Sequence, residues 1–188
     1  MTTTIPELYR RAQDGFGERV HGVHADQWTA ATPCAEWDVR TLVNHLVGEI
    51  RWAVPLFAGA TIAEVGAEFD GDLLGDDPVA AWDAAAPAAI AAVQDPAAMD
   101  RTVHLSFGDF PGSEYASQLF ADLLVHGWDL ARATGQDERL DPELVAACAE
   151  WFADKADGYR EFGAVGPRLT LAAGADQQAE FLAEFGRG

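Results

Sequence analysis

The sequence predicts a mainly α-helical protein organised as a bundle of four long helices. Apolar residues recur at helical spacing in several stretches, and the breaks between these stretches are rich in Gly, Pro and Asp. A single short stretch alternates in the manner of a strand. The 188 residues are enough for one compact core, so we expect one domain over residues 1–188.

The first two helices are predicted from their starting residues. Pro6 is favoured in a first helical turn, and the helix that it begins is expected to end at Val20. After a loop over 21–37, the carboxylate of Asp38 can cap a second helix that ends at Phe57.

The next elements are a short helix and an alanine-rich helix. The short helix is expected at 62–68. Asp77 or Asp76 can cap the alanine-rich helix over 78–94, and Pro87 should bend it.

A short hairpin or extended connection is expected at 101–112, followed by a long helix. The segment RTVHLSFGDFPG alternates polar and apolar residues around a Gly-Asp pair. Ser113 is expected to cap a helix that continues to Ala133, and Gly135 to end it. A further helix over 142–159 and a last short one in the tail are the expected small C-terminal additions.

Composition narrows the possible partners and the compartment. The net charge of −19 disfavours nucleic acid and anionic membrane surfaces. The sequence holds no apolar run of about 18 residues and opens without a leader pattern, so we expect a cytoplasmic protein. Cys34 and Cys148 are far apart and form no CxxC motif, which disfavours a disulfide framework and a four-cysteine zinc site.

The strongest candidate site lies in the predicted helix over 113–133. Asp122 and His126 are four residues apart, and Asp129 follows within another turn, so the three form one polar stripe on an otherwise apolar helix. An unpaired carboxylate inside a bundle would cost several kcal/mol, so this stripe requires partners.

The second predicted helix offers such partners in His45 and Glu49, which are also four residues apart among apolar neighbours. Facing helices could bring His45 to Asp122 and His126. Two imidazoles and a carboxylate are a ligand set for catalytic Zn²⁺ and for Fe²⁺, and Ni²⁺ is compatible. Glu49 and Asp129 are then candidates to orient the ligating imidazoles. The alternative is a helix salt bridge without a metal.

Three segments resemble a known family. WTAATPCAEWDVRTLVNHLVGE (28–49), LFADLLVHGWDLARATGQ (119–136) and the ending LTLAAGADQQAEFLAEFGRG resemble the actinobacterial family related to the N-terminal domain of mycothiol-dependent maleylpyruvate isomerase, in the DinB/YfiT-like superfamily. The resemblance implies a DinB-like four-helix bundle whose divalent metal is held by His45, Asp122 and His126. We expect zinc first, with nickel or iron as alternatives.

The resemblance also implies a function. In the family's chemistry a divalent metal binds mycothiol and presents its thiolate to a small electrophile, and a homodimer is expected on resemblance alone. The isomerase has Glu where this chain has Asp122, and residues 136–188 are too short for the isomerase's C-terminal domain. We therefore expect a mycothiol-linked S-transferase or isomerase. The alternatives are a non-catalytic binding or stress module with an empty site, and a metal-dependent hydrolase.

Other residues carry weaker hypotheses. Cys34 has no histidine beside it in the sequence, so a structured loop is favoured over a reactive thiol. Trp37 is expected to pack at the end of the bundle, and Arg40 and Arg132 to form ion pairs. The sequence has no GxxxxGK[ST] and no GxSxG motif, so nucleotide binding and serine hydrolysis have no support.

Overall fold

The computed structural model describes residues 3–188 and is mainly α-helical. Contacts divide the chain into two compact units, which end at Gln136 and at Gly188. The single domain over 1–188 stays a prediction. No helix within residues 3–188 is both long enough and apolar enough to cross a membrane.

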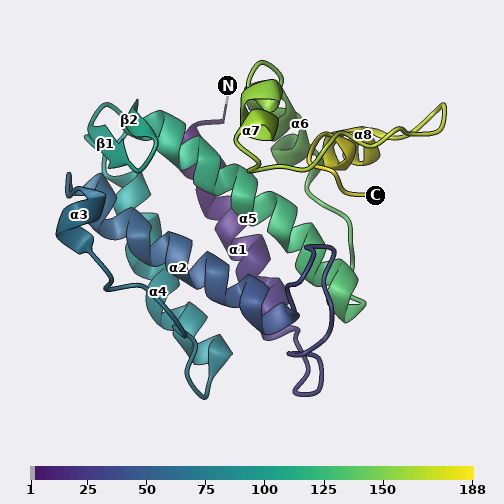
Figure 1. The fold of residues 1–188 in the computed structure, drawn as a ribbon, viewed down its shortest axis with the longest axis horizontal. Coiled ribbons are helices and arrows are strands. Elements are labelled where there is room, and N and C mark those ends of the chain that lie inside the picture. Colours follow the sequence, from purple (N-terminus) through teal and green to yellow (C-terminus); the bar gives the residue numbers. More distant parts are fainter. Residues whose placement is uncertain (1–2) are drawn as a thin grey trace. The chain divides into compact units, whose positions relative to one another are not determined.

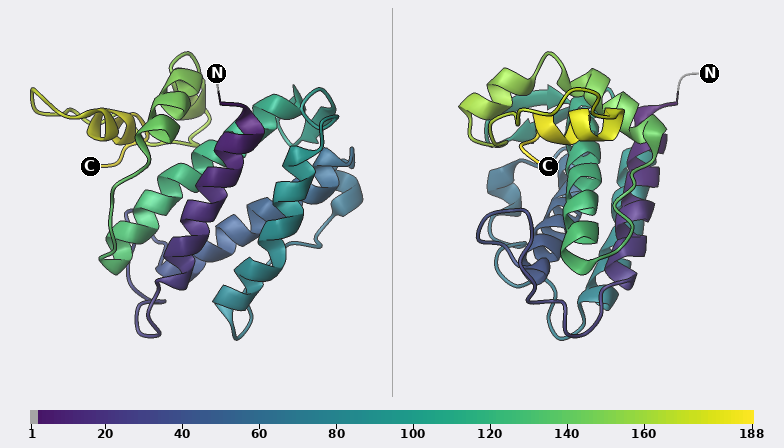
Figure 2. Two further views of the ribbon diagram at one scale, coloured as in Figure 1. Left: turned by 180° about the vertical axis from the view of Figure 1, so that it is seen from behind. Right: turned by 90° about the vertical axis from the view of Figure 1, so that its right-hand side faces the viewer.

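Four long helices form the first unit, and each packs against two of the others in the order α1, α5, α2, α4 and back to α1. Figure 1 shows α2 beside α5, and the left view of Figure 2 shows α1 and α4 from behind. Their bounds are α1 Ile5–His21, α2 Val39–Phe57, α4 Pro78–Gln94 and α5 Gly112–Thr134. The predicted long helices are therefore confirmed.

Apolar side chains from all four helices fill the space between them. Helix α5 is buried on most sides, as its apolar sequence predicts. Five of the fully buried side chains of α2 and α5 are Leu42, Leu46, Ile50, Leu123 and Leu130. Burying one such side chain contributes about 1.5–3 kcal/mol, so this core fixes how α2 and α5 face each other.

The predicted N-caps of α2 and α4 are confirmed. Asp38 accepts a hydrogen bond from Thr41 N, and Asp77 accepts one from Ala80 N. Pro87 lies inside α4. The predicted helix at 62–68 is shorter in the structure, where α3 covers Ile62–Val65 and ends at Gly66 with φ +63°.

The hairpin is confirmed, with β1 over Thr102–Leu105 paired antiparallel to β2 over Gly108–Pro111. It runs directly into α5, because Gly112 N still donates to Arg101 O. Ser113 was expected to cap this helix, and that prediction is wrong: Pro111 holds the N-cap position without a side-chain cap. A Cβ at Gly112 would lie 1.9 Å from Ala98 O, so only glycine fits this junction.

Helix α5 ends as predicted. Gly135 adopts the left-handed conformation with φ +69°, and its N–H donates to Ala131 O. The glycine therefore terminates the long helix that carries most of the candidate site.

The second unit contains three short helices, α6 over Pro142–Phe152, α7 over Ala156–Glu161 and α8 over Gln177–Glu184. The single helix predicted over 142–159 is wrong, because α6 stops at Phe152. Lys155 N donates to Phe152 O there, which closes a turn before α7 starts. The short helix predicted in the tail is confirmed.

Candidate metal centre

The three predicted ligands come together in the first unit. Helix α2 supplies His45, and α5 supplies Asp122 and His126 one turn apart. Asp122 lies between the imidazoles, with Oδ2 3.0 Å from His45 Nε2 and Oδ1 3.2 Å from His126 Nε2. One potential donor atom of each residue lies within 4.8 Å of the other two.

The cluster is reached from one side. The side chains of His45 and Asp122 are 31% and 30% exposed, whereas that of His126 is 11% exposed. A small molecule could therefore approach the edge formed by His45 and Asp122, while the far side of His126 faces the protein interior.

Charge and burial act in opposite directions in the cluster. Burial alone would raise the pKa of Asp122, but the imidazoles of His126 and His45 lower it well below its usual value. Burial disfavours protonation of both histidines, yet Asp122 raises the pKa of His45 and that of His126. Without a metal, the cluster therefore favours an ionised carboxylate between protonated imidazoles.

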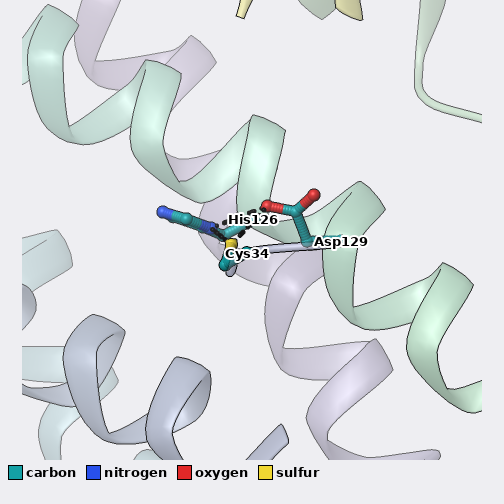
Figure 3. A group of neighbouring side chains, drawn as sticks. All are labelled: Cys34, His126 and Asp129. Carbon is teal, nitrogen blue, oxygen red and sulfur yellow. Dashed lines mark hydrogen bonds and ion pairs between the residues drawn. The ribbon is translucent and has the colours of Figure 1, made fainter. Parts of the chain in front are cut away.

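A second carboxylate holds the inner nitrogen of His126 (Figure 3). Asp129, which is fully buried on α5, has Oδ2 2.9 Å from His126 Nδ1. Because one ring nitrogen faces Asp129, the other faces Asp122. This is the arrangement by which a carboxylate orients a metal-binding imidazole. Asp129 thus contacts one of the predicted ligands, and its role as an orienting group stays a prediction.

The thiol of Cys34 lies against the same pair. Its Sγ donates to Asp129 Oδ2 at 3.2 Å and lies 3.6 Å from His126 Nδ1 (Figure 3). The sequence places no histidine beside Cys34, and the histidine that it contacts in the structure comes from a helix 92 residues away. Cys34, His126 and Asp129 form a second group of potential metal ligands.

The loop before α2 is ordered by its own hydrogen bonds. Cys34 N donates to Thr32 Oγ1, and that hydroxyl lies 3.0 Å from Trp37 O, to which it donates. Trp37 N donates to Cys34 O, and Glu36 between them has φ +67°. The Trp37 ring lies 5.0 Å from the ring of His45 and 5.8 Å from that of His126. The loop therefore contacts both imidazoles.

Glu49 lies one turn beyond His45 on α2 and interacts with the cluster through charge. Burial, with a further contribution from the charge of Asp122, raises the pKa of Glu49 to about 7, although the charges of His45 and His126 act in the opposite direction. Burial, with the charge of Glu49, also raises the pKa values of Tyr9 and Tyr115. Glu49 is thus a carboxyl group that titrates near neutral pH beside the candidate ligands.

Two further histidines, His104 and His21, and the arginine Arg40 form ion pairs with other residues. His104 Nδ1 lies 2.8 Å from Asp109 in the hairpin, and His21 pairs with Asp83. Arg40 forms the expected ion pair, with Asp72.

Arg132 lies over the Trp128 ring, 4.9 Å from its centroid. This is a cation–π contact, and the ion pair expected for Arg132 stays a prediction.

The contacts of Cys34 and Trp37 with the histidines of the cluster were not predicted from the sequence. Both belong to the loop that leads into α2, and helical periodicity gives no information on where a loop returns to the core. One signal was available: the segment TPCAEW joins directly to the helix that carries His45.

The fold and the cluster define a class of helical proteins with a His–Asp–His cluster between two long helices. The family model of the mycothiol maleylpyruvate isomerase N-terminal domain matches residues 9–131, and the chain belongs to this family. Two uncharacterized Mycobacterium tuberculosis proteins, from strains CDC 1551 and H37Rv, are each 40% identical over 141 residues, which cover 73% of this chain and 71% of each relative. A search of solved structures gave no significant match.

Proposed function

We propose that this protein is a divalent-metal-dependent, mycothiol-linked enzyme that acts on small electrophiles as an S-transferase or isomerase. The observation that carries the proposal is the convergence of His45, Asp122 and His126, from two helices, at one partly exposed point. Membership of the mycothiol maleylpyruvate isomerase N-terminal domain family supports a small thiol as partner.

The donor set fits a divalent cation. Tetrahedral zinc with ligand bonds near 2.0 Å separates its N and O donors by roughly 3.3 Å. Asp122 Oδ2 lies 3.0 Å from His45 Nε2 and Oδ1 lies 3.2 Å from His126 Nε2. One donor atom of each residue lies within 4.8 Å of the other two, so small side-chain movements would bring the three donors to an ion. Zinc is our first choice, and nickel and iron share the ligand preference.

A bound divalent metal would lower the pKa of a coordinated thiol and stabilise its thiolate. The residues around it would hold and orient the reactants. Asp129 keeps Nδ1 of His126 engaged, so Nε2 stays directed to the ligand group. Glu49, with a pKa of about 7, can take up the proton that the thiol loses.

We assign the ring of helices α1, α5, α2 and α4 to the DinB-like four-helix bundle, with the ligands on α2 and α5. Asp122 is one methylene shorter than the glutamate of the isomerase, and its contacts with both imidazoles support a ligand role at this length.

Elemental analysis tests the metal. Wild-type protein purified without chelator should carry about one Zn, Ni or Fe per chain, and His45→Ala and Asp122→Ala should carry none. His21→Ala removes a surface histidine that also pairs with an aspartate, so it should keep the metal. Wild-type protein that cannot be loaded would contradict the metal site and favour a binding module.

Turnover tests the thiol. Loaded protein should conjugate a chloro-dinitrobenzene only when mycothiol is added. The rate should fall to background in Asp122→Ala and stay unchanged in His21→Ala. Turnover of substrate without any thiol would favour the metal-dependent hydrolase instead.

A further inference from the structure

We infer that Cys34 is a positioning residue that fixes the His126 imidazole by holding Asp129, and that it is not itself a ligand or a nucleophile. The inference deepens the proposed function, and it rests on that function for its metal-binding consequences alone. The structure carries it through three distances that join one thiol, one carboxylate and one imidazole.

The Cys34 thiol and the His126 ring both contact the same carboxylate oxygen of Asp129. Asp129 Oδ2 accepts from Cys34 Sγ at 3.2 Å and lies 2.9 Å from His126 Nδ1. Asp129 is fully buried, so each hydrogen bond to it replaces water that the carboxylate has lost. The thiol therefore helps to determine which carboxylate oxygen faces the ring.

The backbone around Cys34 holds the thiol in place. The amide of Cys34 donates to Thr32 Oγ1, and its carbonyl accepts from Trp37 N. Ala31 and Asp38 form a backbone bridge across the base of the loop, and Asp38 caps α2. The loop that starts the helix of one ligand thus contacts the helix of the other two.

This arrangement predicts the orientation of His126. With Nδ1–H bonded to Asp129, the ring presents Nε2 to Asp122 and to the ligand group. Without Cys34, the Asp129 carboxylate would keep one partner fewer and gain rotational freedom. Ring orientation would then be less well defined, although the three ligands would all remain.

Two substitutions separate positioning from other roles. Cys34→Ser keeps a donor, whereas Cys34→Ala removes it. Cys148→Ala removes the other cysteine, which is buried in the second unit, and serves as the matched control. Thermal unfolding of all three variants checks that each is folded.

The first measurement needs no metal. The Nδ1 proton of His126 should give a protected downfield resonance in ¹H–¹⁵N spectra of wild-type protein, Cys34→Ser and Cys148→Ala. The resonance should broaden or exchange faster in Cys34→Ala. A resonance unaffected in folded Cys34→Ala would overturn the inference, whatever the metal content of the protein.

The second measurement is Zn²⁺ affinity by competition with a chromophoric chelator. Cys34→Ala should bind about 10-fold more weakly, the lower end of the range for groups that orient a ligand. Cys34→Ser should recover most of the loss, and Cys148→Ala should bind as wild type does. Equal loss in the Ser and Ala variants would overturn the positioning role.

Co²⁺ distinguishes a ligand from a positioning residue. A thiolate bound to Co²⁺ gives intense charge-transfer absorption in the near ultraviolet, and we expect none from the protein loaded with Co²⁺ alone. Such a band, lost in Cys34→Ala, would make Cys34 a ligand and overturn the inference. If the wild type binds neither ion, the proposed function fails, while the proton resonance still decides the role of Cys34.

Discussion

The two compact units bury different kinds of side chain. Within the first, His126 and fully buried Asp129 lie in an otherwise apolar core together with the thiol of Cys34. The second buries an aromatic cluster in which Phe152 and Phe185 stack with their centroids 4.1 Å apart. The polar cluster of Cys34, His126 and Asp129 therefore belongs to the first unit, and the aromatic cluster belongs to the second.

The two clusters differ in how their burial contributes to the stability of the fold. Burying an aromatic ring is favourable without any further partner, whereas a buried carboxylate must have its hydrogen bonds satisfied to be tolerated at all. Replacing such a polar group by well-packed apolar residues is often neutral or stabilising. Folding stability alone therefore does not account for the His–Asp cluster, which supports the proposed binding of a ligand. The family match over residues 9–131 contains this cluster and ends before the aromatic one.

The largest expected effect is a loss of stability on removing an aromatic ring. It tests whether the aromatic cluster contributes to stability alone. Phe152→Ala should lower the free energy of unfolding of residues 137–188 by about 3–5 kcal/mol, because a buried ring is lost and leaves a cavity. Zn²⁺ affinity should stay unchanged, since no ligand comes from this unit. Hydrogen exchange resolves the stability of each unit.

Phe162→Ala provides the control for that experiment. Its side chain is 85% exposed, so stability should change by less than about 0.5 kcal/mol. A loss of Zn²⁺ affinity in Phe152→Ala would show that the aromatic cluster supports the site and would weaken the contrast.

The next largest effect is the loss of Zn²⁺ affinity expected when the carboxylate of Asp122 is removed. Asp122→Ala leaves two imidazoles for the ion, so Zn²⁺ affinity should fall at least 100-fold, or about 2.7 kcal/mol. Asp122→Glu introduces the residue of the isomerase and should retain binding. Chelator competition measures both. Retained affinity in the Ala variant would remove Asp122 from the ligand set.

The helices and the ligand faces could be predicted from the sequence because both depend on local periodicity. Apolar spacing located the long helices, and four-residue spacing placed His45 and Glu49 on one face of α2 and Asp122 and His126 on one face of α5. Their convergence depends on how α2 packs on α5, which spacing within one helix does not determine.

Features that depend on tertiary contacts could not be predicted in this way. The return of Cys34 to Asp129 is set by a loop whose path follows from its hydrogen bonds, including one with Thr32. The break after Phe152 interrupts a pattern that is otherwise helical, because a turn forms there and Phe152 stacks on Phe185. Ser113 has the chemistry of a cap, but the strand hydrogen bonds extend to Gly112 and leave it no place.

Asp129 allows a finer test of the polar cluster. Asp129→Asn keeps the size of the side chain but can turn an N–H toward Nδ1 of His126, which disfavours the ring orientation that serves a metal. Zn²⁺ affinity should fall about 10–100-fold. Asp83→Asn alters the exposed partner of His21 and should leave affinity unchanged. Wild-type affinity in Asp129→Asn would mean that Asp129 serves the fold alone.

The smallest effect concerns Glu49 and is set by pH. Its pKa is raised to about 7 in the folded chain, against an ordinary value of 4.5, so its destabilising effect grows as pH rises from about 4.5 to about 7. Glu49→Gln should therefore stabilise the metal-free protein by about 1–2 kcal/mol at pH 8 and by less at pH 5. Chemical denaturation at both pH values measures the difference, with exposed Glu68→Gln as control. Bound Zn²⁺ should reduce the stabilisation by Glu49→Gln, because the charge of the ion favours the ionised form of Glu49. An equal gain at both pH values would show that Glu49 does not titrate as a buried neighbour of the cluster.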